Sequence, residues 1–348
     1  EYDGTSDVTR KAVRDTDYKI LGVVAGEEND LDITYNFSLY QNGSNAGGDR
    51  PVSFQDMHLA GSAKDNYYMD MLNFNAIGKI TPKELTMEQV AGAEFTKVYD
   101  GNTNVTQTLQ SGVNYKLTGV VTNVVTGEDD IVSIDTTSAV GAYQTKNAQA
   151  DGAKQNVTFT GLTLTGSGAG NYTIAGSTTL TNAGVIRPKD ITIKENDISY
   201  LYYDSTFQIR KEYDGTADTS YTPIRGRHYD LEGVVSGEQL DVHVGKGAYA
   251  DKNAGERKTV TFSNLSLYDV NGVNAEKNYR LATSSFTSNL GKISQKRVEV
   301  QVLPGVRFDK EYDGTFDVTR KAVRDTDYKI LGVVAGEEND LDITYNFS

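Results

Sequence analysis

The feature that most constrains this chain is a copied segment. Residues 1–38 recur at 311–348 with one difference, Ser6 against Phe316. The two copies set a long period of 310 residues. Such close identity indicates a nearly duplicated block, and it predicts that the 348 residues are a window on a longer tandem array.

A shorter and more diverged repeat lies inside the long one. The triplet Tyr-Asp-Gly occurs four times, at spacings of 97, 114 and 99 residues. Each triplet is followed by Gly-Val-Val and Gly-Glu, and three of them later by Asn-Tyr and a closing Gly-x-Ile. The repeating unit is therefore about 100 residues long. The triplets are Tyr2-Asp3-Gly4, Tyr99-Asp100-Gly101, Tyr213-Asp214-Gly215 and Tyr312-Asp313-Gly314.

The residue pattern within each unit predicts β-strands. After Gly-x-Ile, apolar residues alternate with polar ones, as at Leu85, Met87, Val298, Val300 and Val302. This period of two is typical of a half-buried strand. Turn-forming residues separate the other predicted strands, which lie at 19–24, 32–40, 52–59, 84–90, 157–164, 172–175 and 260–267.

About seven short strands per unit are typical of a two-sheet sandwich. We therefore predict an all-β chain made of tandem immunoglobulin-like β-sandwich modules in an elongated array. The module boundaries fall just after Gly-x-Ile. They define a module at 1–80 that lacks its first strand, complete modules at 81–186 and 187–293, and the first half of a module at 294–348.

A sandwich without one strand exposes an unpaired edge and an apolar groove. Residues 294–310, or their copy in a neighbouring chain, are expected to supply the missing strand to residues 1–80. In one interpretation, the chain is cropped from a longer polypeptide, and covalent continuity supplies the strand. In the other, separate subunits complete each other head to tail by strand donation.

Five ordered motifs carry a family resemblance: Lys-x-Tyr-Asp-Gly, Gly-Val-Val-x-Gly-Glu, Asn-Ala-Gly, Asn-Tyr and a closing Ile-x-Pro-Lys. Together they resemble the YDG/MBG-type repeats of large, filamentous bacterial surface adhesins, over essentially the whole chain. Residues 147–149 lack the Gly of Asn-Ala-Gly, and residues 293–296 lack the Pro. The resemblance implies an extracellular protein, displayed on the bacterial cell surface, whose repeats form a stalk or fibre.

Composition excludes several other classes of protein. The net charge of −14 argues against nucleic-acid binding. No apolar run approaches the ~18 residues of a membrane-spanning helix, so no membrane insertion is expected in this segment. The absence of Cys excludes a disulfide framework and a thiolate nucleophile.

The triplet itself is either a binding site or a structural turn. In the structural interpretation, Asp-Gly forms the turn, and the Tyr packs at the sandwich corner and satisfies its hydroxyl. The acidic residues Glu27, Glu28, Asp30 and Asp32 are weak candidates for Ca²⁺ ligands, against a solvated turn. No other cofactor is expected.

Two further features have a functional and a structural interpretation. Lys97, Lys211 and Lys310, two residues before three of the triplets, are candidates for isopeptide crosslinks or guards of an edge strand. Tyr200, Tyr202 and Tyr203 either bind sugar rings or are ordinary strand residues.

Catalysis is not expected. His58, His228 and His243 do not share a repeat position, and no unit carries its own cluster of polar residues. We predict a structural repeat segment of an adhesin that projects or links cells, with neighbouring copies of the same repeat as partners. The alternatives are a self-assembling surface fibre or matrix subunit that polymerises by strand donation, and a module that binds a host glycan or protein.

Overall fold

The computed structural model describes residues 1–123, 126–150, 153–196 and 202–344. Its regular structure is nearly all β-strand, which confirms the prediction of an all-β chain. The helical elements of these residues are short 3-10 turns, and none is long and apolar enough to cross a membrane. The chain separates into two compact units, Glu1–Lys97 with Asn102–Ile186, and Val98–Gly101 with Arg187–Ser348.

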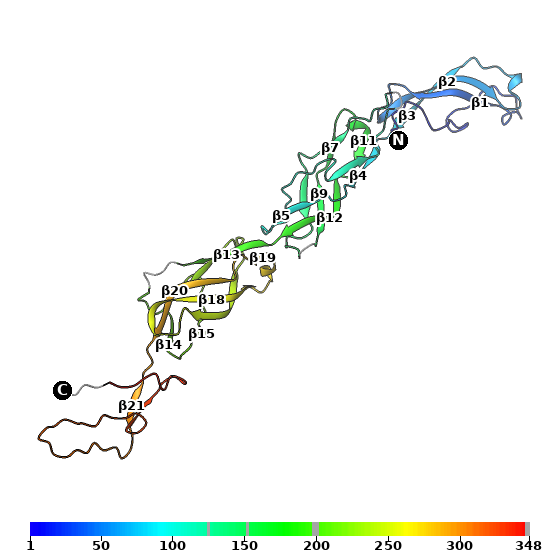
Figure 1. Ribbon diagram of the computed structural model, residues 1–348. Helices are drawn as coiled ribbons and strands as arrows, with labels where there is room; N and C mark the ends of the chain where they lie inside the picture. Colours follow the sequence, from blue (N-terminus) through cyan, green and yellow to red (C-terminus); the bar gives the residue numbers. More distant parts are fainter. Residues whose placement is uncertain (124–125, 151–152, 197–201, 345–348) are drawn as a thin grey trace. The chain divides into compact units, whose positions relative to one another are not determined.

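The first repeat, residues 1–80, contributes one antiparallel sheet to the first unit (Figure 1). Its strands, in spatial order, are β1 (Asp32–Tyr40), β2 (Gly47–Ala60) and β3 (Asn73–Ile80), with the 3-10 turn η1 (Lys64–Asn66) between the last two. The predicted strand at 32–40 is confirmed with the same bounds. Phe54 of β2 stacks on Phe74 of β3, with ring centroids 4.4 Å apart.

The second repeat, residues 81–186, builds more than one sheet. A four-stranded sheet has the order β5-β12-β9-β8, a three-stranded sheet the order β11-β4-β6, and β10 pairs with β7. The predicted strand at 157–164 is divided into β9 and β10 by Gly161, which has a φ of +73°. The elements are β4 (Lys83–Gln89), β5 (Phe95–Val98), β6 (Tyr115–Thr118), β7 (Ser133–Asp135), β8 (Val140–Tyr143), β9 (Gln155–Thr160), β10 (Thr163–Thr165), η2 (Ala169–Asn171), β11 (Tyr172–Ile174) and β12 (Ser177–Arg187).

The third repeat, in the second unit, follows the same plan. A five-stranded sheet has the order β14-β20-β18-β17-β15, and a three-stranded sheet the order β16-β13-β19. The elements are β13 (Lys189–Glu195), β14 (Ile209–Glu212), β15 (Asp218–Thr219), β16 (Tyr229–Glu232), β17 (Leu240–Tyr249), β18 (Gly255–Asp269), η4 (Ala275–Asn278), β19 (Tyr279–Leu281) and β20 (Ser285–Ser294).

The leading strand of a repeat, which follows Gly-x-Ile, occupies the centre of the three-stranded sheet. β4 pairs antiparallel with β6 on one edge and parallel with β11 on the other. β13 pairs in the same way with β16 and β19. The leading strand is thus flanked on both sides, and Leu85 of β4 is only 2% exposed.

The last strands of the chain are β21 (Glu299–Val302) and β22 (Tyr328–Leu331), which form an antiparallel pair (Figure 1). β22 repeats the sequence of residues 18–21, for which we predicted a strand at 19–24. That prediction is wrong, because residues 19–24 form no strand. The physical reason is the partner: β22 pairs with β21, whereas residues 19–24 pair with no strand in the described part of the chain.

Candidate functional site

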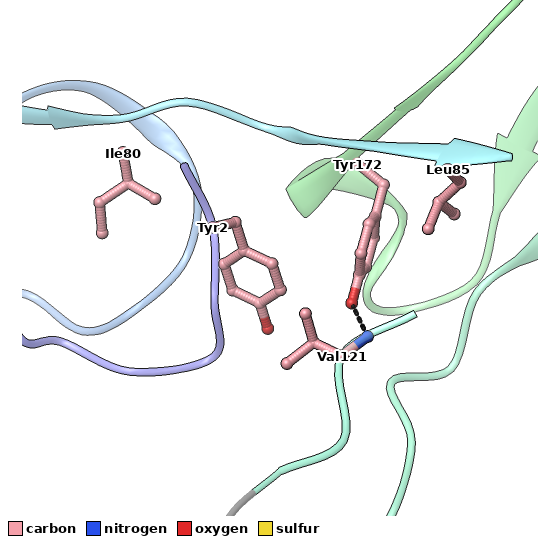
Figure 2. Close-up of a cluster of buried hydrophobic side chains, with 5 residues drawn as sticks. All are labelled: Tyr2, Ile80, Leu85, Val121 and Tyr172. Carbon is pink, nitrogen blue, oxygen red and sulfur yellow. Dashed lines mark hydrogen bonds between the residues drawn. The ribbon is translucent and has the colours of Figure 1, made fainter. Parts of the chain in front are cut away.

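The tyrosine of the first Tyr-Asp-Gly triplet is buried in a cluster that spans two repeats. Tyr2 is 5% exposed and packs with Ile80 of its own repeat and with Leu85, Val121 and Tyr172 of the next (Figure 2). Its ring meets that of Tyr172 edge to face, with centroids 5.4 Å apart. The sequence interpretation placed this ring at a sandwich corner, and the structure packs it largely against the following repeat.

One carboxylate receives both tyrosine hydroxyls of this cluster. The hydroxyls of Tyr2 and Tyr172 donate to Asp130 Oδ2, over 2.8 Å and 2.7 Å. The Tyr172 hydroxyl also accepts the backbone N–H of Val121 at 2.9 Å, as the dashed line in Figure 2 marks. We call this arrangement of triplet tyrosine, carboxylate and Asn-Tyr tyrosine the tyrosine joint.

The same joint recurs in the second unit, around the triplet residue Tyr99. The hydroxyls of Tyr99 and Tyr279 donate to the two oxygens of Glu238. The Tyr279 hydroxyl accepts the N–H of Val235 at 3.0 Å. The two rings again meet edge to face, with centroids 5.4 Å apart. The matching distances show that the arrangement belongs to the repeat and is not an accident of one sequence.

Tyr213 makes part of the joint with the fourth repeat. Its hydroxyl lies 2.7 Å from Glu337 Oε2, and Lys252 forms an ion pair with the same carboxylate. Beside Tyr213 lies an open groove of about 440 Å³, whose lining includes Asn253 and Val334. In the first joint, the Asn-Tyr tyrosine Tyr172 packs at the corresponding place beside Tyr2.

The glycine of the triplet is required by the turn and by the joint. Gly4, Gly101 and Gly215 have φ between +80° and +85°, the left-handed region that favours glycine. A Cβ on each would also lie 2.7–2.9 Å from the second valine of Gly-Val-Val in the following repeat. Those valines are Val121, Val235 and Val334. Any side chain at these positions therefore strains the backbone and separates the repeats.

The triplet's aspartate holds the turn itself. Asp3, Asp214 and Asp313 each accept the backbone N–H and the hydroxyl of the threonine two residues later. These local bonds satisfy the backbone where it reverses direction.

The Asn-Ala-Gly motif of the first repeat also contacts the second repeat. The N–H of Ala46 donates to Asn171 Oδ1 at 2.9 Å, and Asn171 Nδ2 donates to Asn45 at 3.2 Å. Asn171 precedes Tyr172 of the joint. Four of the recurrent motifs, Tyr-Asp-Gly, Gly-Val-Val, Asn-Ala-Gly and Asn-Tyr, therefore meet where the first repeat contacts the second.

The second repeat supplies its joint carboxylate from an unexpected position. The Gly-Glu motif contributes Glu238 and Glu337 to the joints of the second unit, but Asp130 replaces Glu128 in the first. Four extra residues separate Gly-Val-Val from Gly-Glu here. Residues 122 and 129 pair across the base of this longer segment, and the N–H of Asn123 donates to the carbonyl of Glu128. This pairing places Asp130, and not Glu128, beside Tyr2.

The joints raise the pKa of their tyrosines, because burial and a nearby carboxylate both disfavour the charged phenolate. Burial, reinforced by the hydrogen bond to Asp130, raises the pKa of Tyr2 to about 12. The same causes raise the pKa values of Tyr99, Tyr172 and Tyr279 above their usual range. At Tyr213 the hydrogen bond to Glu337 is the main cause of the raised pKa. The hydroxyls therefore remain donors at neutral pH.

The four candidate calcium ligands contact separate partners. Glu27 accepts the Tyr67 hydroxyl, Glu28 the N–H of Gly26, Asp30 the Ser62 hydroxyl, and Asp32 the Tyr18 hydroxyl. Among the residues that the structure describes, no three His, Asp or Glu side chains are grouped as metal ligands.

The recurrent lysines contact the triplet turn. Lys211 donates to Asp214 Oδ1 at 2.7 Å and to the carbonyls of Thr216 and Asp218, and Lys310 contacts Asp313 and Thr315 in the same way. Lys97 donates to the carbonyls of Asn102 and Asn104. The lysine head group therefore bonds the turn that follows it in the sequence.

The tyrosine-rich segment presents a buried ring and an exposed one. Tyr202 is buried, its hydroxyl accepts the N–H of Arg257, and the Arg257 guanidinium lies 4.6 Å from its ring centroid. Tyr203 is exposed, and Tyr200 lies outside the described residues. With Tyr202 covered, the described part of this segment offers one open aromatic face.

The three histidines lie in unlike surroundings. His228 is buried, its Nδ1 accepts the N–H of Ile224, and burial lowers its pKa. His243 is exposed on β17 and stacks on Tyr268, and His58 lies 3.2 Å from Asp56.

These observations define a class: an all-β repeat protein in which consecutive repeats share a tyrosine–carboxylate contact. The chain belongs to the YDG domain family, whose profile matches residues 81–180 and 203–286, more than half of the chain. No curated protein and no solved structure is significantly similar to it.

Proposed function

We propose that this chain is a structural repeat segment, a stalk or fibre, of an extracellular bacterial adhesin. In this proposal, immunoglobulin-like β-sandwich modules of about 100 residues follow one another in an elongated array that projects from or links cells, without catalysis. The observation that carries the proposal is the tyrosine joint, which recurs in both units with the same ring geometry.

The chemistry of the joint suits a load-bearing connection between modules. A tyrosine ring fills an apolar site of the following repeat, and its hydroxyl donates to a carboxylate. Hydrogen bonds to charged groups contribute about 1.5–3 kcal/mol each, more than bonds between neutral groups. Because the ring and the hydroxyl fix two points, the contact restricts both bending and rotation about the linker.

Small-angle X-ray scattering of the whole chain tests this role. Tyr99→Ala and Tyr213→Ala should each increase flexibility and broaden the distribution of interatomic distances, while circular dichroism shows unchanged strand content. Tyr312→Ala is the matched control, because this triplet tyrosine is 97% exposed in the described structure. Scattering curves that do not change in the joint variants would contradict a structural joint.

Surface display is tested separately on the source organism. Antibodies raised against residues 1–348 should label intact cells, and protease added outside the cells should remove the labelling. Labelling that requires permeabilised cells would contradict an extracellular role.

A further inference from the structure

The third repeat contains a polar groove where its edge strand β15 leaves β17. β15 pairs with residues 247–248 of β17 and ends at Thr219. The groove is lined by residues 218–222, by residues 244–247 of β17 and by Asn264 of β18. Its volume is about 460 Å³, within the ~300–1,000 Å³ that is usual for small-molecule sites.

The groove coincides with two residues of β17 that are smaller than their counterparts in β1 of the first repeat. Both strands end at a tyrosine nine residues after a buried leucine, which aligns them without a gap. Val244 therefore takes the place of Tyr35. Gly245 likewise takes the place of Asn36. In the first repeat the Tyr35 side chain bridges the two segments, because its hydroxyl accepts the N–H of Ala12 at 2.9 Å.

The other residues around this space differ between the two repeats in a matching way. Ala12 corresponds to Pro223, which is buried and has no N–H that needs an acceptor. Asp56, which accepts a hydrogen bond from Asn36, corresponds to Asn264. Both of these residues have positive φ, +54° and +56°. The third repeat therefore lacks the bridging side chains without leaving a backbone N–H unsatisfied at Pro223.

Four polar side chains of the lining form no hydrogen bond or ion pair with the part of the chain that the structure describes: Ser220, Thr222, Lys246 and Asn264. Together they offer both donors and acceptors. Asp218 and Lys246 contribute one charge of each sign, so the lining carries no net charge. The sequence did not group these residues, because they come from three separate segments.

One aromatic ring completes the lining. The ring of Tyr221 meets that of the buried His228 edge to face, with centroids 5.4 Å apart. Its hydroxyl lies 3.3 Å from His228 Nε2. In the first repeat these two positions hold Arg10 and Asp17, which form an ion pair. The third repeat thus has an aromatic side chain, fixed by its neighbour, where the first repeat has a charged pair.

We propose that this groove binds a neutral saccharide unit, a function that goes beyond the proposed structural role and does not depend on it. A sugar ring carries hydroxyls that both donate and accept hydrogen bonds, and a face of C–H groups that packs on an aromatic ring. An ion would meet no net charge in the groove. A wholly apolar ligand would bury the polar side chains without partners, which costs free energy.

Saturation-transfer difference NMR on the full chain tests the proposal, with the methyl glycosides of glucose, galactose, mannose and N-acetylglucosamine as probes. We expect transfer to one or more of them. The double variant Pro223→Ala and Val244→Tyr restores the bridging pair of the first repeat, and it should weaken binding at least about tenfold because the ring fills the groove. His243→Thr is the matched control, because it also introduces the first-repeat residue on β17 but lies outside the groove.

Lys246→Ala and Asn264→Ala remove polar groups without filling the groove. Each should weaken binding about fivefold, the effect of one hydrogen bond, while circular dichroism shows unchanged strand content. No transfer to any of the four glycosides, or equal transfer in the filled double variant, would overturn the proposal. A peptide of alternating Thr and Val, which would extend the sheet along β17, is the competing probe. Transfer to this peptide alone would also overturn the proposal, because the groove would then bind a strand.

Discussion

Residues 1–38 and 311–348 have nearly the same sequence and differ in what surrounds them. Tyr2 is buried among residues of the next repeat, whereas its copy Tyr312 is exposed. Residues 328–331 form β22 against β21, whereas residues 18–21 form no strand. Because the local sequence is shared, these differences come from neighbouring parts of the chain and not from intrinsic propensity.

Local features, in contrast, are the same in both copies. Asp15 and Asp325 both have positive φ, and the N–H of each donates over 2.8 Å to the carbonyl three residues later. Arg10 bonds Asp17 as Arg320 bonds Asp327. The comparison therefore separates what a repeat forms alone from what it forms with its neighbours.

The largest expected effect is the loss of a joint ring. Tyr2→Ala should lower the free energy of unfolding of the first unit by about 3–5 kcal/mol, as for other buried aromatic side chains. Tyr312→Ala should change stability by less than about 0.5 kcal/mol, because the ring is exposed. Urea unfolding followed by circular dichroism measures both values. Equal losses would show that the buried and exposed tyrosines do not differ as the comparison states.

A smaller difference is expected at the glycines. Gly4→Ala and Gly314→Ala both place a Cβ at positive φ, which costs about 1–2 kcal/mol. In Gly4→Ala the new atom would also lie 2.8 Å from Val121, whereas Gly314 has open space. We expect Gly4→Ala to lose about 1–3 kcal/mol more. The same urea experiment measures the difference, and a value near zero would mean that the repeats are not in contact there.

The hydroxyl of Tyr2 should account for a pH-dependent part of the joint. Its pKa is raised to about 12 in the folded chain, above about 10 in the unfolded one. Its contribution is therefore complete below pH 10 and is lost as the pH rises towards 12. Tyr2→Phe should lose about 1.5–3 kcal/mol at pH 7, because the hydroxyl donates to a charged group. A pH series of unfolding experiments should show a shallower alkaline loss in Tyr2→Phe than in the unaltered chain, and parallel curves would contradict this assignment.

The smallest effect is expected for the lysines of the turn. Lys211→Met and Lys310→Met should each lose less than about 1 kcal/mol, and by similar amounts, because both bonds are local. The Lys211 ammonium lowers the pKa of Asp214 to about 2. Its contribution is present above about pH 4 and is lost as the pH falls towards 2. Acid titration of stability should lose this component in Lys211→Met, and a much larger effect at Lys211 than at Lys310 would show that the contact is not local.

Much of the strand pattern could be predicted from the sequence, because alternation is a local property. The strand at 32–40 has the predicted bounds, and the strands predicted at 52–59 and 260–267 lie within β2 and β18. The strand at 19–24 could not be judged in this way, since the copy of these residues forms β22 only where β21 pairs with it.

The tyrosine joint was not predicted, although its tyrosines and the carboxylates Glu238 and Glu337 belong to recurrent motifs. Each motif was assigned to its own repeat, whereas Tyr2 and Asp130 are 128 residues apart. The sequence did contain a usable signal, because each repeat carries a recurrent tyrosine and a recurrent acidic residue. The hydroxyl of a buried tyrosine can donate its hydrogen bond to such a carboxylate. The role of Asp130 had no such signal, since the longer segment before Gly-Glu displaces the expected Glu128.

In the tyrosine joint, the tyrosine of one repeat is covered by the next repeat along the chain. This direction affects the order in which the repeats become fully packed. The triplet lies near the start of a repeat, but most of the residues that cover its tyrosine follow the closing Gly-x-Ile, as Leu85, Val121 and Tyr172 do for Tyr2. Since synthesis proceeds from the N-terminus, Tyr2 remains uncovered until Tyr172 has been made. The triplet tyrosine of each repeat is therefore covered only when the next repeat has been made. During synthesis, the most recently made repeat presents an uncovered tyrosine.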